Sequence, residues 1–122
     1  MLQKTSYIFV DDNTMIFKAK IIHLYGGFFK KTGKVGTYVL TAIPHRRVTR
    51  QFITKTIHLA IITTQKKKYQ RINGIHIKFN LNKIVFLSDQ KKFIGTRIYG
   101  PIAQEILQTK LTRLLSVAKK AC

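Results

Sequence analysis

Three short runs of basic residues are the places in this sequence where side chains could most clearly do chemistry. The richest run precedes an Asn73-Gly74 pair and places an aromatic residue among its cations: Lys66, Lys67, Lys68, Tyr69 and Arg71. Ammonium and guanidinium groups bind phosphate oxygens, and the guanidinium can do so through two parallel bonds. An aromatic ring can stack on an exposed base. This run therefore predicts contact with a phosphate polymer whose bases are accessible.

Two further runs repeat this chemistry. One follows Phe28-Phe29 and supplies Lys30, Lys31 and Lys34. The other follows Pro44 and supplies Arg46, Arg47 and Arg50. A single further cation, Lys78, is expected on a later strand. One basic run alone is as readily a solvated surface as a binding site. Three runs in predicted loops, in a chain with 23 basic and only 4 acidic residues, favour RNA binding.

The net charge of +19 points the same way. Such an excess repels itself in a compact monomer, and a polyanion that binds the folded form relieves the repulsion. Nucleic acid is the leading candidate, and a membrane surface is second. Membrane insertion is not expected, because Val35 to Pro44, among the longest uncharged stretches, is far shorter than the roughly 20 residues that span a bilayer. Surface attachment is disfavoured because the cations do not lie on one amphipathic helix.

Acidic and nucleophilic residues predict no enzyme, no cofactor and no metal site. Asp11 and Asp12 are adjacent, so on a strand their side chains would point to opposite faces. Glu105 has no acidic partner nearby in sequence, the histidines are scattered, and Cys122 is the only cysteine. No phosphate-binding glycine loop or nucleophile motif is present. Asp12-Asn13 is expected to close a turn through hydrogen bonds from side chain to backbone. The sequence indicates no role for Cys122.

Most of the chain has the period of β-strands. Ile75, Ile77 and Phe79 alternate with polar residues and predict a strand with one face in the core. Further strands are expected at 16–25, 35–43, 52–64 and 84–87, separated by glycine or Asn-Gly turns. In the strand at 52–64, one side should carry Ile53, Ile57, Leu59 and Ile61. Short strands without helices between them predict a small closed barrel, with the run at 66–71 near the tip of a projecting β-ribbon.

The period changes in the last quarter of the chain. Pro101 suits a first helical position, and Ile102 and Ile106 are four residues apart. A second helical face is marked by Leu111, Leu114, Leu115 and Ala118. Amphipathic helices of this kind usually pack on their own domain, so these leucines are expected in the core.

Residues 95–106, G-T-R-I-Y-G-P-I-A-Q-E-I, resemble the signature G-T-R-I-F-G-P-V-x-R-E-L of the L-fourteen family of large-subunit ribosomal proteins. The likeness continues in order along nearly the whole chain: residues 1–3 resemble M-I-Q, 10–13 V-A-D-N, 24–27 V-L-G-G, 73–79 D-G-x-x-I-R-F and 115–118 I-S-L-A. Gln104 departs from the family's arginine. Residues 42–44 resemble its A-I-P about four positions early, which leaves the register of the 42–50 loop open.

The resemblance implies an all-β fold, a small five-stranded β-barrel with a projecting β-ribbon and short C-terminal helices. One domain would span residues 1–122, with the barrel over 1–95 and the helical segment over 100–120. The resemblance also implies a structural role in the large ribosomal subunit through binding of large-subunit rRNA. Thr96 and Arg97 would form an intersubunit bridge to small-subunit rRNA. Implied partners are ribosomal proteins L-three and L-nineteen and a ribosome-silencing factor.

The location and one competing function complete the expectations. Lysine and isoleucine, 17 of each, have A/T-rich codons, and the chain drifts from the family pattern while keeping its signature. We therefore expect a mitochondrial ribosome in the matrix, with synthesis inside the organelle because Met1 matches the family's start. A plastid or a bacterial cytoplasm is the alternative location. The competing function is a stand-alone OB-like single-strand-binding module, which would carry aromatic stacking platforms on its outer strands.

Overall fold

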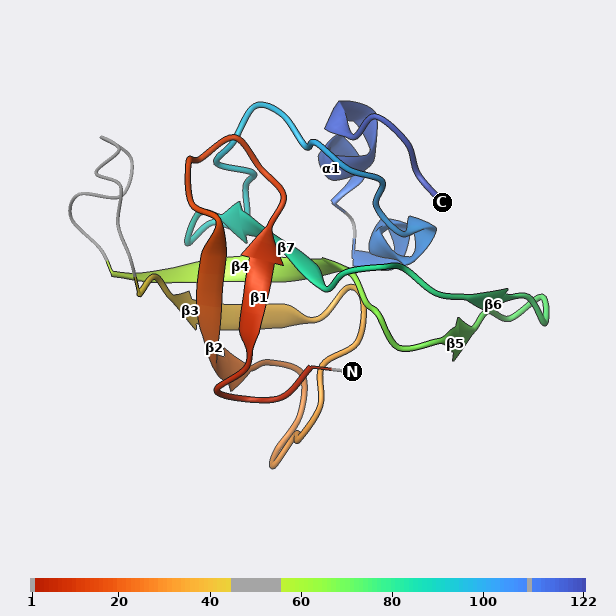
Figure 1. Ribbon diagram of the computed structural model, residues 1–122, viewed down its shortest axis with the longest axis horizontal. Coiled ribbons are helices and arrows are strands. Elements are labelled where there is room, and N and C mark those ends of the chain that lie inside the picture. The colour runs from red at the N-terminus through yellow and green to blue at the C-terminus, as the bar shows by residue number, and fades with distance from the viewer. Residues whose placement is uncertain (1, 45–55, 110) are drawn as a thin grey trace.

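Five strands of the chain form a closed barrel (Figure 1). The structure is a computed structural model and describes residues 2–44, 56–109 and 111–122. The barrel order is β1-β2-β3-β4-β7. β1 and β7 pair in parallel and the other neighbours are antiparallel. The strands are β1 (Tyr7–Val10), β2 (Lys18–Leu24), β3 (Tyr38–Ala42), β4 (Ile57–Thr64) and β7 (Lys83–Leu87). The predicted all-β barrel is confirmed.

The barrel interior is filled by every second residue of its strands, as the period of a pleated strand requires. Ile8 on β1 and Phe86 on β7 are fully buried there. β2, β3 and β4 contribute Ala19, Ile21, Leu24, Val39, Ala60 and Ile62 to the same cluster, and β7 adds Ile84. On β1 and β2 the alternate residues are exposed or partly exposed, so that side of the barrel has an open outer surface.

β4 and β7 differ from β1 and β2 because both of their faces are buried. Ile61 and Val85 point away from the barrel interior and belong to a second cluster, which Ile98, Ile102, Ile106 and Leu114 complete from the C-terminal segment. The predicted grouping of Ile57, Leu59 and Ile61 therefore describes the outer face of β4, while Ile53 lies outside the described residues. Ile57, beyond the cover of this segment, is half exposed.

The C-terminal segment contains two short helices and lies against the outer side of the barrel. η2 (Gln104–Thr109) is a 3₁₀ helix, and α1 (Thr112–Val117) is an α-helix. Single β-bridges join Ile98 to Ala118 and Ile102 to Ala121. The predicted short helices are confirmed, but the first begins at Gln104 and not at Pro101. Ile106 and Leu114 are buried against the barrel as predicted, whereas Leu111, Leu115 and Ala118 are only partly buried there.

A two-stranded ribbon of β5 (Tyr69–Gln70) and β6 (His76–Ile77) projects from the barrel (Figure 1). The turn at its tip uses Gly74 at a φ of +86°, a conformation that glycine adopts without strain. The prediction that Ile75, Ile77 and Phe79 face the core is wrong. Ile75 is exposed and the other two are only partly buried, because no second layer covers the ribbon among the residues that the structure describes.

The position of the basic run on the ribbon also needs correction. Lys66, Lys67 and Lys68 were expected near its tip but lie at its base, between β4 and β5. The Lys66 backbone N–H donates to Asn82 Oδ1 at 2.7 Å, and the Phe79 N–H donates to the Gln65 carbonyl at 3.2 Å. These bonds hold together the two chain segments that enter and leave the ribbon.

Candidate nucleic-acid interface

Four of the predicted RNA-contact residues line one open hollow at the base of the ribbon. Lys66, Lys67 and Lys68 come from the segment before β5 and Lys78 from the segment after β6, and all four are exposed. Gln3, Thr32 and Asn82 complete the lining. We call this set the lysine hollow. Four ammonium groups around one concave surface can contact several phosphates of a folded polyanion at once.

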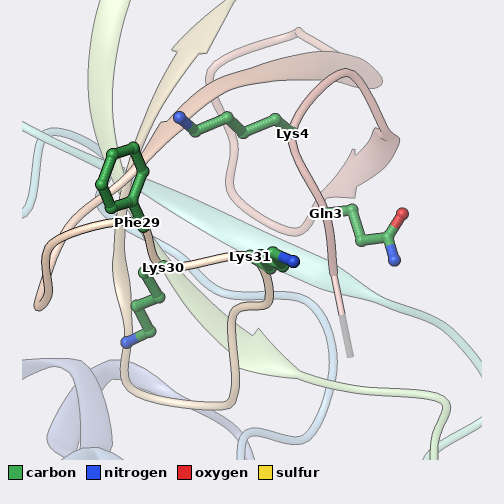
Figure 2. Close-up of a pocket in the computed structure, with 5 residues that line it drawn as sticks. All are labelled: Gln3, Lys4, Phe29, Lys30 and Lys31. Atoms are coloured by element: carbon green, nitrogen blue, oxygen red, sulfur yellow. The ribbon is translucent and has the colours of Figure 1, made fainter.

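The second predicted run adjoins the lysine hollow. Phe29, Lys30 and Lys31, from the loop between β2 and β3, surround a neighbouring depression with Gln3 and Lys4 (Figure 2). Gln3 lines both hollows, so the two are contiguous. Lys34 lies elsewhere, around a third hollow that it shares with Lys67 and Lys68. The fold thus brings two runs that are far apart in sequence onto one cationic surface.

The few carboxylates of the protein do little to neutralise this surface. Asp11 and Asp12 are buried, and Glu105 forms an ion pair within the molecule. Asp89 lies in the turn after β7, on a segment that contributes no lining to these hollows. The lysines around the ribbon base therefore keep their charge available for an external anion.

Tyr69 and Arg71 are engaged inside the molecule. Arg71 Nε lies 2.5 Å from Glu105 Oε1 and Nη2 lies 3.2 Å from Oε2, which makes a bidentate pair. The Tyr69 hydroxyl donates to Glu105 Oε2 at 3.0 Å, and Arg71 Nη2 also donates to the Cys122 carbonyl. We call Tyr69, Arg71 and Glu105 the clasp. It fastens the ribbon to η2, so the RNA-contact role of Tyr69 and Arg71 stays a prediction beside a structural role.

The clasp changes the ionisation of all three side chains. Burial and the hydrogen bond to Glu105 raise the pKa of Tyr69 to about 12. Burial alone would raise the pKa of Glu105, but hydrogen bonds from Arg71, its own backbone and Tyr69 outweigh it and lower the pKa. The hydrogen bond to Glu105 raises the pKa of Arg71. At neutral pH the carboxylate is therefore charged and the phenol is a neutral donor.

Thr96 and Arg97 are exposed, and Asn13 holds their backbone. Asn13 Oδ1 accepts from the Thr96 N–H at 2.9 Å and from the Arg97 N–H at 3.4 Å, while Nδ2 donates to Thr96 Oγ1 at 2.6 Å. A Cβ added to Gly95 would lie 2.8 Å from Asn13 Oδ1. Glycine is needed here for close approach to Asn13, and the Arg97 side chain is left on the surface.

Asp11 fixes the other end of the same loop. Its Oδ1 accepts from Lys83 Nζ at 2.8 Å, and its Oδ2 accepts from the Gly100 N–H at 3.2 Å. A Cβ at Gly100 would lie 2.5 Å from that ammonium nitrogen. Sequence reasoning missed this role of Asp11. The available signal was that two of only four acidic residues are adjacent, beside an asparagine.

Asp12 is buried and satisfies three donors. Its Oδ2 accepts from the Phe86 N–H at 3.1 Å, and its Oδ1 accepts from both the N–H and the hydroxyl of Thr14. The bond to the Thr14 N–H closes the turn that the sequence predicted. Burial raises the pKa of Asp12 in spite of these hydrogen bonds.

Arg46, Arg47 and Arg50 lie outside the described residues, so their predicted contacts stay predictions. Within the described ranges no cluster of histidine, cysteine, aspartate and glutamate could hold a metal ion. No helix in the described part of the chain has the length and apolar composition that crossing a bilayer requires.

Comparisons with known proteins cover the whole chain. A family model described as ribosomal protein L14p/L23e matches residues 1–122. The chain is also 33% identical over 124 residues to a protein of Petrotoga mobilis named large ribosomal subunit protein uL14, with 98% of each chain covered. The likeness therefore includes the barrel, the ribbon and the C-terminal segment.

Proposed function

Because the chain belongs to the ribosomal protein L14p/L23e family, whose members are structural constituents of the large ribosomal subunit, we propose that it binds large-subunit rRNA through the lysine hollow and the adjoining loop. The observation that carries the proposal is the gathering of Lys66, Lys67, Lys68 and Lys78 around one concave surface. Lys30 and Lys31 extend the contact through the adjoining depression, and Lys34 through the hollow that it shares with Lys67 and Lys68. Arg46, Arg47 and Arg50 are proposed to add to it.

Binding is expected to depend steeply on salt. Each phosphate that a lysine neutralises releases counterions and contributes about 0.7 to 0.9 to the slope of log affinity against log salt concentration. The measurement is affinity of the purified chain for its rRNA fragment across a salt series. A slope near zero would contradict the proposal. Gradient sedimentation of a cell lysate separates the two candidate functions. A ribosomal protein should sediment with the large subunits, whereas a stand-alone single-strand-binding module should remain at the top of the gradient.

A second element of the proposal is that Thr96 and Arg97 contact small-subunit rRNA when the subunits join. The support is their exposure and the rigid backbone that Asn13 and Asp11 give the loop. A guanidinium on a fixed loop can bind a phosphate across an interface with two parallel hydrogen bonds. Neighbouring ribosomal proteins L-three and L-nineteen and a ribosome-silencing factor are proposed as partners on the resemblance of residues 95–106 to the family signature.

Arg97→Ala is expected to leave incorporation into the large subunit intact and to weaken subunit joining, most visibly at low magnesium. The reason is that the Arg97 side chain is exposed, and that Asn13 contacts this residue through its backbone N–H. Subunit association is measured by light scattering over a magnesium series, with Arg113→Ala, another exposed arginine, as the control. Normal joining of Arg97→Ala subunits at every magnesium concentration would remove Arg97 from the bridge.

The proposed location is a mitochondrial ribosome, with a plastid or a bacterial cytoplasm as the alternative. The support is the lysine and isoleucine bias together with drift away from the family pattern outside residues 95–106. Detection of the protein with an antibody in purified mitochondria, in purified plastids or in a bacterial lysate distinguishes the three locations.

A further inference from the structure

The outer face of β1 and β2 carries aromatic rings alternating with lysines. Tyr7 and Phe9 are 60% and 41% exposed, whereas Ile8 between them is buried in the barrel. On β2 the cross-strand partner of Tyr7 is Lys20, and that of Phe9 is Lys18. Neither ring lines the lysine hollow. We call Tyr7, Phe9, Lys18 and Lys20 the β1–β2 face.

The contacts within this face are weak and easily exchanged. Lys18 Nζ lies 5.3 Å from the centre of the Phe9 ring, and Lys20 Nζ lies 6.0 Å from that of Tyr7. The second distance is at the outer limit of a cation–π contact. An incoming flat group could therefore displace each ammonium from its ring, and the ammonium would remain beside it on the neighbouring strand.

Nucleotides fit this arrangement better than a protein surface does. A base offers a flat face to the ring, and its phosphate offers an anion to the displaced lysine. Two rings separated by one residue of a strand are roughly 7 Å apart along it, so each can take a different base. An apolar protein partner would instead have to bury both ammonium groups, which is unfavourable without paired acids.

From this juxtaposition we propose that the β1–β2 face is a stacking platform for unpaired rRNA nucleotides, separate from the phosphate contacts of the lysine hollow. The proposal rests on the proposed rRNA-binding function and names the form of RNA that this second surface takes. Duplex RNA cannot use it, because its bases are stacked on one another and do not present a free face.

Tyr7→Ala and Phe9→Ala are each expected to weaken binding of the full chain to a short single-stranded oligouridylate by roughly 5-fold to 100-fold. Affinity for a duplex of the same length should change little. Tyr7→Phe and Phe9→Tyr keep an aromatic ring and should bind the oligouridylate as the unaltered chain does. Both rings point outward, so the thermal midpoint of unfolding is expected to remain near that of the unaltered protein.

A direct reading of stacking is available because the chain contains no tryptophan. In a Tyr7→Trp variant, the fluorescence of the new indole should be quenched when the oligouridylate binds. Tyr99→Trp, at another exposed tyrosine outside the face, is the matched control and should be quenched much less.

Three outcomes would overturn the inference. If both alanine variants bind the oligouridylate normally while lysine-hollow variants fail to bind the rRNA fragment, the platform is refuted and the proposed function stands. If the alanine variants bind RNA normally but fail to enter the large subunit, the face belongs to a protein neighbour. If the unaltered chain binds neither the oligouridylate nor the rRNA fragment at low salt, the inference and the proposed function fail together.

Discussion

Replacing Lys66, Lys67, Lys68 and Lys78 with alanine is expected to weaken binding to the rRNA fragment by about a thousandfold at roughly 0.1 M salt. Each phosphate contact contributes about 0.7 to 0.9 to the salt slope, which is roughly fivefold to eightfold in affinity at that concentration, and four such contacts give about a thousandfold. The slope should therefore fall by about 3 to 4 if every lysine holds one phosphate. Affinity is measured over a salt series, with the melting temperature as a check on folding.

The matched control removes the same charge from another part of the surface. Lys91, Lys92, Lys119 and Lys120 are all exposed, and none lines the lysine hollow. Their replacement with alanine lowers the net charge equally and should leave most of the salt slope in place. Equal losses in the two quadruple variants would mean that overall charge, and not the hollow, determines binding.

Asp12→Ala is expected to lower the free energy of unfolding by about 2 to 4 kcal/mol, because the buried N–H groups of Thr14 and Phe86 lose their acceptor. For a chain of this size the melting temperature should fall on the order of 10 °C. The loss should also loosen Asn13 and with it the Thr96–Arg97 loop. Chemical and thermal denaturation measure the first effect, and amide hydrogen exchange at Thr96 measures the second.

Asp12→Asn is the informative companion variant. It keeps the size of the side chain and one acceptor oxygen, so its loss should be smaller than that of Asp12→Ala. Because burial raises the pKa of Asp12, this carboxyl favours the folded state below its ordinary pKa, and that contribution is lost as pH rises through the raised value. The asparagine variant should lack this pH dependence. Equal stability of both variants and the unaltered chain would show that Asp12 does not organise the turn.

The sequence predicted the elements of this fold better than their surroundings. Strand periods, the Asn73-Gly74 turn and the signature at 95–106 were enough to indicate a barrel, a ribbon and short C-terminal helices. Which face of β4 enters the barrel could not be read locally, because both faces are apolar. The outer face is buried by residues distant in sequence, among them Ile98, Ile106 and Leu114. The prediction that Ile75 faces the core failed for a related reason. Alternation of apolar and polar residues marks one face of a strand, but it does not show whether another element covers that face.

The candidate interface was predicted by residue type and not by contact. The lysines at 66–68 and at 78 were identified because cations in loops bind phosphates, and the fold gathers them. The clasp was missed because Glu105 and Arg71 are far apart in sequence, and so was the hold of Asn13 on Thr96. The Tyr7–Phe9 pair had a usable signal, namely aromatic residues at alternate positions opposite lysines with the same spacing.

The parallel pairing of β1 with β7 determines the order in which the barrel can close. β1 to β4 are neighbours in sequence and can form an antiparallel meander, but the seam joins Phe9 to Lys83 across most of the chain. Until β7 is added, β1 and β4 both present unpaired edges, and closure of such a distant contact is slow. The lysines opposite β1 are expected to repel other copies during this interval. The same positive charge that suits a bound polyanion should thus protect the half-folded chain from aggregation.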